Sequence, residues 1–129
     1  MHEWAIAEAI VREVERNLKR TKVSSIRIVL GELQNIDKDI LDQYLKMMIR
    51  EVAPSVKISY ETEEALFRCR RCGLTWKLKD VHLTDFEREA IHFVPESVHA
   101  YVKCPRCGSP DFSILKGRGV KISFEVEEQ

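Results

Sequence analysis

The chain has 129 residues, a mass of 15.0 kDa and equal numbers of basic and acidic side chains, 21 of each. This length fits one ordinary domain or two small ones and excludes a large multidomain enzyme. The balanced charge lacks the strong basic excess expected of a dedicated nucleic-acid-binding protein. Because the sequence has no run of about 18 apolar residues and no basic, then apolar, leader, we expect neither a membrane span nor a signal peptide, and a cytoplasmic location.

The first half of the sequence alternates between helix and strand patterns. Residues 3–20 place apolar side chains three or four positions apart with charges opposite them, which predicts an amphipathic helix. Residues 24–31 alternate apolar and polar side chains and predict a strand. A second helix is expected to start after Asn35 or Asp37 as N-cap and to run to about residue 52, before Pro54. A second alternating segment, residues 56–61, predicts another strand.

All four cysteines lie in two Cys-x-x-Cys pairs, each followed by glycine: Cys69 with Cys72, and Cys104 with Cys107. Two such pairs can surround one ion with a tetrahedron of sulfur, and zinc is the default metal. Because the protein supplies all four ligands, no position stays open for water, and we predict a structural zinc. Iron, as in rubredoxin, fits the same sulfur cage. A single pair would also suit a thioredoxin-like redox motif, although that motif is expected to open a helix in a βαβ unit.

The two cysteine pairs lie between two similar strand patterns, residues 56–61 and 120–125. We therefore expect an α+β fold in which the cysteine region is inserted into another domain. Residues 1–64 and 118–129 are predicted to form a small three-stranded sheet with two helices, and residues 65–117 a zinc-ribbon domain. The stretch from about 78 to 100 fits both a helical and an irregular structure.

The N-terminus is a second candidate metal site. The terminal amine of Met1, the deprotonated amide nitrogen of His2 and the His2 Nδ1 can chelate one ion through adjoining rings, which favours Ni(II) or Cu(II). A fourth ligand has to come from elsewhere, and the other histidines are His82, His92 and His99. The residues alone also allow a plainer interpretation, in which His2 is a solvated terminal residue and Glu3 an acid favourable at a helix N-terminus.

Taken together, these residues resemble the HypA family of nickel metallochaperones. The resemblance covers essentially the whole chain, and the long spacing between the cysteine pairs is similar to the archaeal form of the family. The matching features occur in the family's order: Met1-His2-Glu3-Trp4-Ala5-Ile6-Ala7, Gly31-Glu32-Leu33, both cysteine pairs and the closing strand.

The resemblance implies a chaperone that binds Ni(II) as cargo at its N-terminus and delivers it for insertion into the [NiFe] hydrogenase large subunit during maturation, with no catalytic residues. It implies a nickel site made of Met1, His2, Glu3 and His92, with His99 as the alternative to His92. The zinc would be held by the four cysteines. The implied partners are a nickel-handling GTPase or P-loop ATPase and the hydrogenase large-subunit precursor, with no nucleic acid and no membrane; monomer and homodimer both stay open.

The alternative function is that of a zinc-ribbon module that binds nucleic acid or another protein. Its contact surface would be the basic side chains around the cysteine pairs: Arg68, Arg70, Arg71, Lys77, Lys79, Arg106, Lys116 and Arg118. A charge cluster of this kind is usually a solvated face, and this alternative leaves the N-terminal pattern unexplained.

Overall fold

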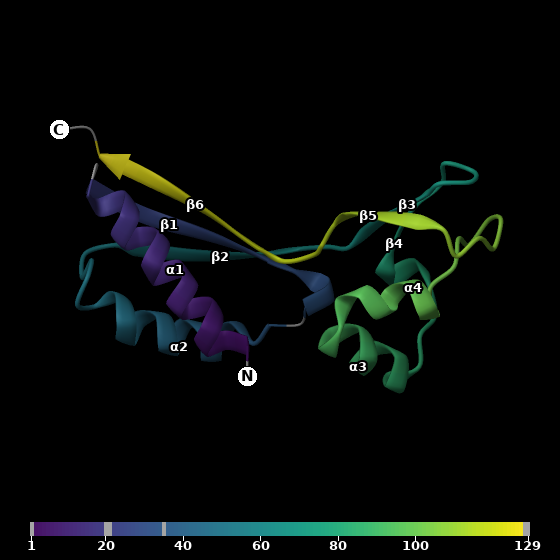
Figure 1. Cartoon of the computed structure of the whole chain (residues 1–129), viewed down its shortest axis with the longest axis horizontal. Coiled ribbons are helices and arrows are strands. Elements are labelled where there is room, and N and C mark those ends of the chain that lie inside the picture. The colour runs from purple at the N-terminus through teal and green to yellow at the C-terminus, as the bar shows by residue number, and fades with distance from the viewer. Residues whose placement is uncertain (1, 20–21, 35, 128–129) are drawn as a thin grey trace. The chain divides into compact units, whose positions relative to one another are not determined.

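The computed structural model describes residues 2–19, 22–34 and 36–127 (Figure 1). The chain divides into two compact units, and each is described by itself. The first unit comprises Met1–Val29, Ile36–Glu61 and Lys121–Gln129, and the second comprises Leu30–Asn35 and Thr62–Val120.

These bounds lie within a few residues of the predicted division, 1–64 with 118–129 against 65–117, apart from one segment. Residues 30–35 belong to the second unit, although they directly follow the first predicted strand. That each unit is a domain able to fold alone stays a prediction.

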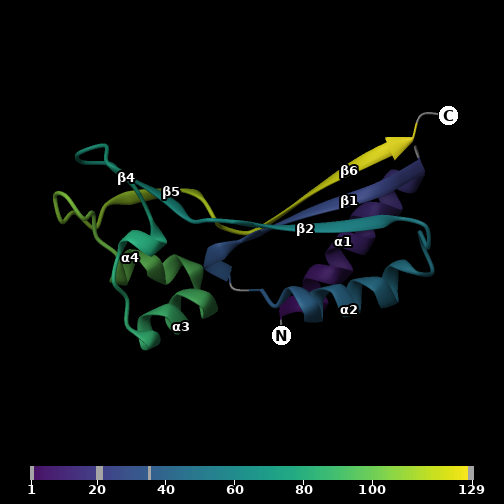
Figure 2. The same cartoon turned by 180° about the vertical axis from the view of Figure 1, so that it is seen from behind.

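The first unit is a three-stranded sheet with two helices on one face, as predicted (Figures 1 and 2). The helices pack against each other, and β1 is the central strand, in the order β2-β1-β6. β2 runs parallel to β1, with the helix between them in sequence as the crossover, whereas β6 runs in the opposite direction (Figure 1). The elements are α1 (His2–Leu18), β1 (Lys22–Gly31), α2 (Lys38–Ile49), β2 (Lys57–Glu63) and β6 (Val120–Glu127).

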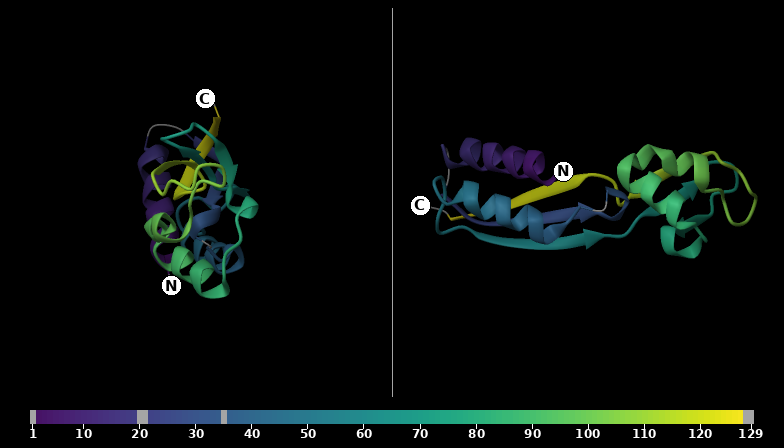
Figure 3. Two further views of the ribbon diagram at one scale, coloured as in Figure 1. Left: turned by 90° about the vertical axis from the view of Figure 1, so that its right-hand side faces the viewer. Right: turned by 90° about the horizontal axis from the view of Figure 1, so that it is seen from below.

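The core of the first unit comes from the periodic positions of the sequence. Ile26 and Ile28 of β1 are fully buried, and so are Val14 of α1 and Leu45 of α2. The carboxylate of Asp37 caps α2 by accepting the backbone N–H of Ile40 at 3.1 Å. The other predicted cap, Asn35, lies outside the described residues. Figure 3 shows the two helices side by side along the sheet.

The second unit is built on an antiparallel sheet with the order β4-β3-β5. Three aromatic rings fill its centre: the ring centroid of Phe112 lies 5.2 Å from that of Phe67 and 5.3 Å from that of Trp76, and all three residues are buried. The strands are β3 (Leu66–Cys69), β4 (Thr75–Lys77) and β5 (Phe112–Lys116).

The stretch between the cysteine pairs is largely helical, which settles the alternative that the sequence left open. The longest helix of this stretch, α3, begins after its N-cap Thr84 with a capping box. The Thr84 hydroxyl accepts the backbone N–H of Glu87, and the Glu87 carboxylate accepts the backbone N–H of Thr84. Ile91 and Val98 are buried in the same hydrophobic core as the side chains of the sheet, so the helices of this stretch pack against it. The elements are η2 (Leu78–Asp80), α3 (Asp85–Phe93), η3 (Pro95–Ser97) and α4 (Val98–Tyr101).

A junction of close backbone segments ties residues 30–35 into the second unit. The backbone N–H of Gly31 donates to the Gly119 carbonyl at 2.8 Å, and that of Leu33, in η1 (Glu32–Gln34), donates to the Gly117 carbonyl at 2.9 Å. Leu33 is fully buried in the core of this unit. The family-like sequence Gly31-Glu32-Leu33 therefore has a structural role here.

Two carboxylates complete this glycine junction. The Glu32 side chain accepts the backbone N–H of Ala65, and the Glu63 side chain accepts that of Gly117, both at 2.8 Å. A buried backbone N–H without a partner would cost free energy, so these acids stabilise the point where the chain segments meet.

Candidate metal centre

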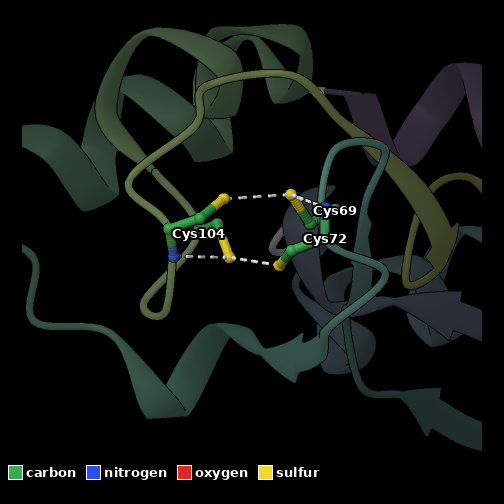
Figure 4. Close-up of side chains that lie close together, drawn as sticks. Cys69, Cys72 and Cys104 are labelled. Carbon is green, nitrogen blue, oxygen red and sulfur yellow. Dashed lines mark hydrogen bonds between the residues drawn. The ribbon is translucent and has the colours of Figure 1, made fainter.

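The four cysteines converge on one point of the second unit. Cys69 ends β3, Cys72 lies in the following turn, and Cys104 and Cys107 lie in the loop before β5. All four sulfur atoms lie within 4.8 Å of one another. The sulfurs of the two pairs face each other (Figure 4), with Cys69 Sγ 3.5 Å from Cys107 Sγ and Cys72 Sγ 3.6 Å from Cys104 Sγ. A zinc tetrahedron with Zn–S bonds of about 2.3 Å needs S···S separations of about 3.8 Å, so the cage fits the metal.

Backbone amides favour thiolates on the first pair. The backbone N–H of Leu74 donates to the Cys72 sulfur and lowers the pKa of that thiol to about 6, although desolvation opposes the shift. The backbone N–H of Cys72, at 3.4 Å from Cys69 Sγ, lowers the pKa of the Cys69 thiol in the same way. Gly73 makes this turn possible, since its φ of 79° is in the left-handed region that favours glycine.

The four sulfurs cannot all carry charge without a cation. Although the backbone N–H of Ser109 donates toward the Cys107 sulfur, desolvation and the neighbouring thiols raise the pKa of Cys107 to about 11. A divalent ion at the centre of the cage removes this conflict, because it binds the deprotonated sulfurs. The donor set is therefore that of a closed, structural zinc centre.

The residues predicted for nickel belong to both units, and each is described within its own unit. Met1 lies outside the described residues, and His2 is the first residue of α1 in the first unit. Glu3 is 8% exposed, and its carboxylate accepts the backbone N–H of Asp37 at 3.1 Å. Glu3 thus fastens the first turn of α1 to the start of α2. Among the described residues, the group of potential metal ligands that comes together is that of the four cysteines, and the nickel site stays a prediction.

The two candidate histidines of the second unit differ in their surroundings. His92 lies in the last turn of α3, and its Nδ1 is buried without a hydrogen-bond partner among the described residues. The His99 ring stacks on Phe112, with ring centroids 4.5 Å apart and an interplanar angle of 29°. His99 is therefore engaged in packing, and His92 keeps a ring nitrogen with no partner within the described part of the chain.

Most basic side chains of the alternative binding surface already have partners. Arg70 pairs with Asp111, Arg118 pairs with Glu96, and Arg106 donates to the Cys72 carbonyl. Lys77 and Lys79 both pair with Glu64. These pairs satisfy the cations within the unit, which does not favour a nucleic-acid surface. Separately, none of the helices in the described ranges has the length and apolar character that crossing a membrane would need.

Comparison with known proteins agrees with the resemblance seen in the sequence. The family model described as "Hydrogenase/urease nickel incorporation, metallochaperone, hypA" matches residues 1–126. Hydrogenase maturation factor HypA of Pyrococcus abyssi is 46% identical over 136 aligned positions, which cover 100% of this chain and 98% of that protein. The protein of the same name from Pyrococcus furiosus is 48% identical over 129 positions, which cover 95% and 93% of the two chains.

A solved structure supports the fold. The solution structure of the Ni metallochaperone HypA from Helicobacter pylori matches with a TM-score of 0.63 and 18% identity, covering 100% of both chains. With the family match over nearly the whole sequence and the four-cysteine centre in place, the chain belongs to the HypA family of nickel metallochaperones for hydrogenase maturation.

Proposed function

We propose that this chain binds Ni(II) at its N-terminus and delivers it for insertion into the [NiFe] hydrogenase large subunit during maturation. The observation that carries this proposal is the family match, which begins at residue 1 and reaches residue 126. The closed cysteine centre leaves no open coordination position for cargo, so the nickel needs a separate set of ligands.

The proposed nickel ligands are the terminal amine of Met1, the amide nitrogen and imidazole of His2, and the imidazole of His92, with Glu3 beside them. Nitrogen donors in a plane suit Ni(II). The buried, unpartnered Nδ1 of His92 within the described residues supports its choice over His99. The hydrogen bond from Asp37 to the Glu3 carboxylate supports a role for Glu3 in holding the first turn that follows the chelate.

We further propose that the chain carries nickel without catalysing a reaction, in the cytoplasm. Its partners would be a nickel-handling GTPase or P-loop ATPase and the hydrogenase large-subunit precursor. The sequence has no GxxxxGK[ST] phosphate loop of its own, so any nucleotide dependence would belong to the partner.

Adding three glycines before Met1 is expected to weaken nickel binding about 100-fold or more, because they move the primary amine away from His2 while every side chain is kept. A single added residue would not serve, since it makes His2 the third residue, and the amine, two amide nitrogens and the imidazole can then still chelate Ni(II) in one plane. The measurement is calorimetry at neutral pH on zinc-loaded protein with the native and the extended N-terminus. Zinc content should be the same in both forms, which controls for damage to the second unit. Equal nickel affinities would place the site elsewhere.

Replacing His92 with alanine is expected to weaken nickel binding by about 10- to 100-fold and to change the visible absorption of the Ni(II) complex, because one nitrogen ligand is lost. The matched control is His99→Ala, which removes an imidazole from the same unit and should leave the nickel spectrum unchanged while lowering the stability of that unit. If His99→Ala alters the spectrum and His92→Ala does not, the fourth ligand is His99.

A further inference from the structure

A groove of about 520 Å³ lies between α2 and β2 in the first unit, and neither metal site uses it. This volume is within the range of ligand-binding pockets, about 300–1,000 Å³. The α2 side presents Lys38, Asp42, Lys46 and Arg50, four residues spaced one helical turn apart. The floor includes Ile58 and Tyr60, alternate positions of β2 whose side chains share one face of the strand, and Val56, which lies just before it.

The negative charge in this groove is already neutralised. Asp42 accepts the Tyr60 hydroxyl at 2.8 Å and pairs with Lys46 at 2.9 Å. Burial and the Asp42 carboxylate raise the pKa of Tyr60, so its hydroxyl stays protonated and keeps donating. The groove is thus left with the charges of Lys38 and Arg50.

These two cations stand at opposite ends of the groove. The Lys38 ammonium lies 5.7 Å from the centre of the Tyr60 ring. The Arg50 guanidinium makes no hydrogen bond or ion pair with any residue that the structure describes. Lys38 and the C-cap Arg50 are twelve positions apart along α2, which corresponds to a backbone rise of about 18 Å. A small anion can reach one of these cations but not both, so the spacing favours an elongated occupant with negative charge at both ends.

The neighbouring strand supplies the second half of the argument. β2 is an outer strand of the β2-β1-β6 sheet, and the outer edge of such a strand offers backbone N–H and C=O groups to another chain. A strand added there would direct alternate side chains toward α2. Six residues of extended chain span about 20 Å, which matches the spacing of Lys38 and Arg50 along α2.

We propose that this groove binds an extended peptide segment of a partner protein, which adds to β2 as a fourth strand. The segment carries two acidic side chains six residues apart, which pair with Lys38 and Arg50, and apolar side chains between them, which contact Ile58 and Tyr60. This interaction is separate from metal carriage and does not depend on the nickel site.

The test uses the full-length, zinc-loaded, nickel-free chain and a capped, fluorescein-labelled peptide, Glu-Thr-Val-Thr-Val-Thr-Glu, followed by fluorescence anisotropy. We expect saturable binding that Arg50→Glu weakens about tenfold or more. The matched control is Lys57→Glu, which makes the same charge change at an exposed position on the other face of β2. Equal weakening by both variants, or no binding by the parent peptide, would overturn the proposal.

Backbone pairing is tested on the peptide, so the fold of the protein is not disturbed. One version is N-methylated at residues 2, 4 and 6, and the other at residues 3, 5 and 7. Only one of these sets faces β2 in an added strand, so one version should lose binding and the other should keep it. If both bind like the parent, or if millimolar inorganic phosphate displaces the peptide, the groove is a simple anion site and strand addition is wrong.

Discussion

Replacing Cys104 with serine is expected to abolish zinc retention and to unfold the second unit, while the first unit keeps its structure. The Cys104 sulfur is one of the four ligands of the cage, and the residue is 2% exposed in the core of that unit. Structural zinc contributes on the order of 10 kcal/mol to folding in small domains, which is comparable with the whole stability of a typical domain. The loss of one ligand therefore removes the main source of stability of the ribbon.

The two tryptophans report on the two units separately. Trp76 is 3% exposed and packs against Phe67 and Phe112 in the second unit. Trp4 is 47% exposed and lies edge-on to Tyr44 in the first unit. In a Trp4→Phe background, both Cys104→Ser and chelation of zinc should shift the Trp76 emission to the red. Adding zinc back should restore the emission of the chelated protein but not that of the Cys104→Ser protein. In a Trp76→Phe background, the emission should not change.

A second cysteine variant separates ligand loss from packing. Cys107 is exposed, so Cys107→Ser removes a ligand but little buried contact. It should also lose zinc and unfold the second unit as Cys104→Ser does, which would assign the effect to the metal rather than to packing. A Cys104→Ser protein that keeps one equivalent of zinc and the native Trp76 emission would show that the cage is not what holds this unit together.

Features set by local sequence were predictable. The spacing of Val14 and its neighbours gave a helix, and the alternation around Ile26 and Ile28 gave the central strand, because burial on one face imposes those periods. The cysteine cage was predictable for a related reason, since a Cys-x-x-Cys turn aims both sulfurs at one point whatever surrounds it.

Features that depend on contacts between distant segments were not predictable. Nothing in the pattern of residues 30–35 shows that Leu33 is buried in the second unit, because this placement depends on backbone hydrogen bonds to residues 117–119. The capping carboxylates of Glu32 and Glu63 were missed for the same reason. The sequence did contain one signal for a close approach of two backbone segments: Gly117 and Gly119, two glycines with a single residue between them. The capping box Thr84-x-x-Glu87 was likewise in the sequence as a sign of α3.

Replacing Gly117 with alanine is expected to lower the free energy of unfolding by about 4 kcal/mol or more, among the largest effects of a single substitution. A Cβ on this residue would lie 2.4 Å from the Ala65 Cα and 2.7 Å from the Ala65 nitrogen, so backbone has to move. Any movement there strains two hydrogen bonds, from Leu33 to the Gly117 carbonyl and from Gly117 to the Glu63 carboxylate. The φ of 93° adds a separate cost for any residue with a side chain.

Gly119→Ala is the matched control, because it isolates the backbone cost from the steric one. Gly119 also has a positive φ, 82°, but the nearest atom to its added Cβ is the Gln34 Oε1 at an ordinary 3.6 Å. This variant should lose only about 1–2 kcal/mol. Urea unfolding of zinc-loaded protein, followed through Trp76 emission, measures both values. Equal losses would mean that the junction relaxes around the new methyl group, and that close packing at Gly117 does not hold residues 30–35 in the second unit.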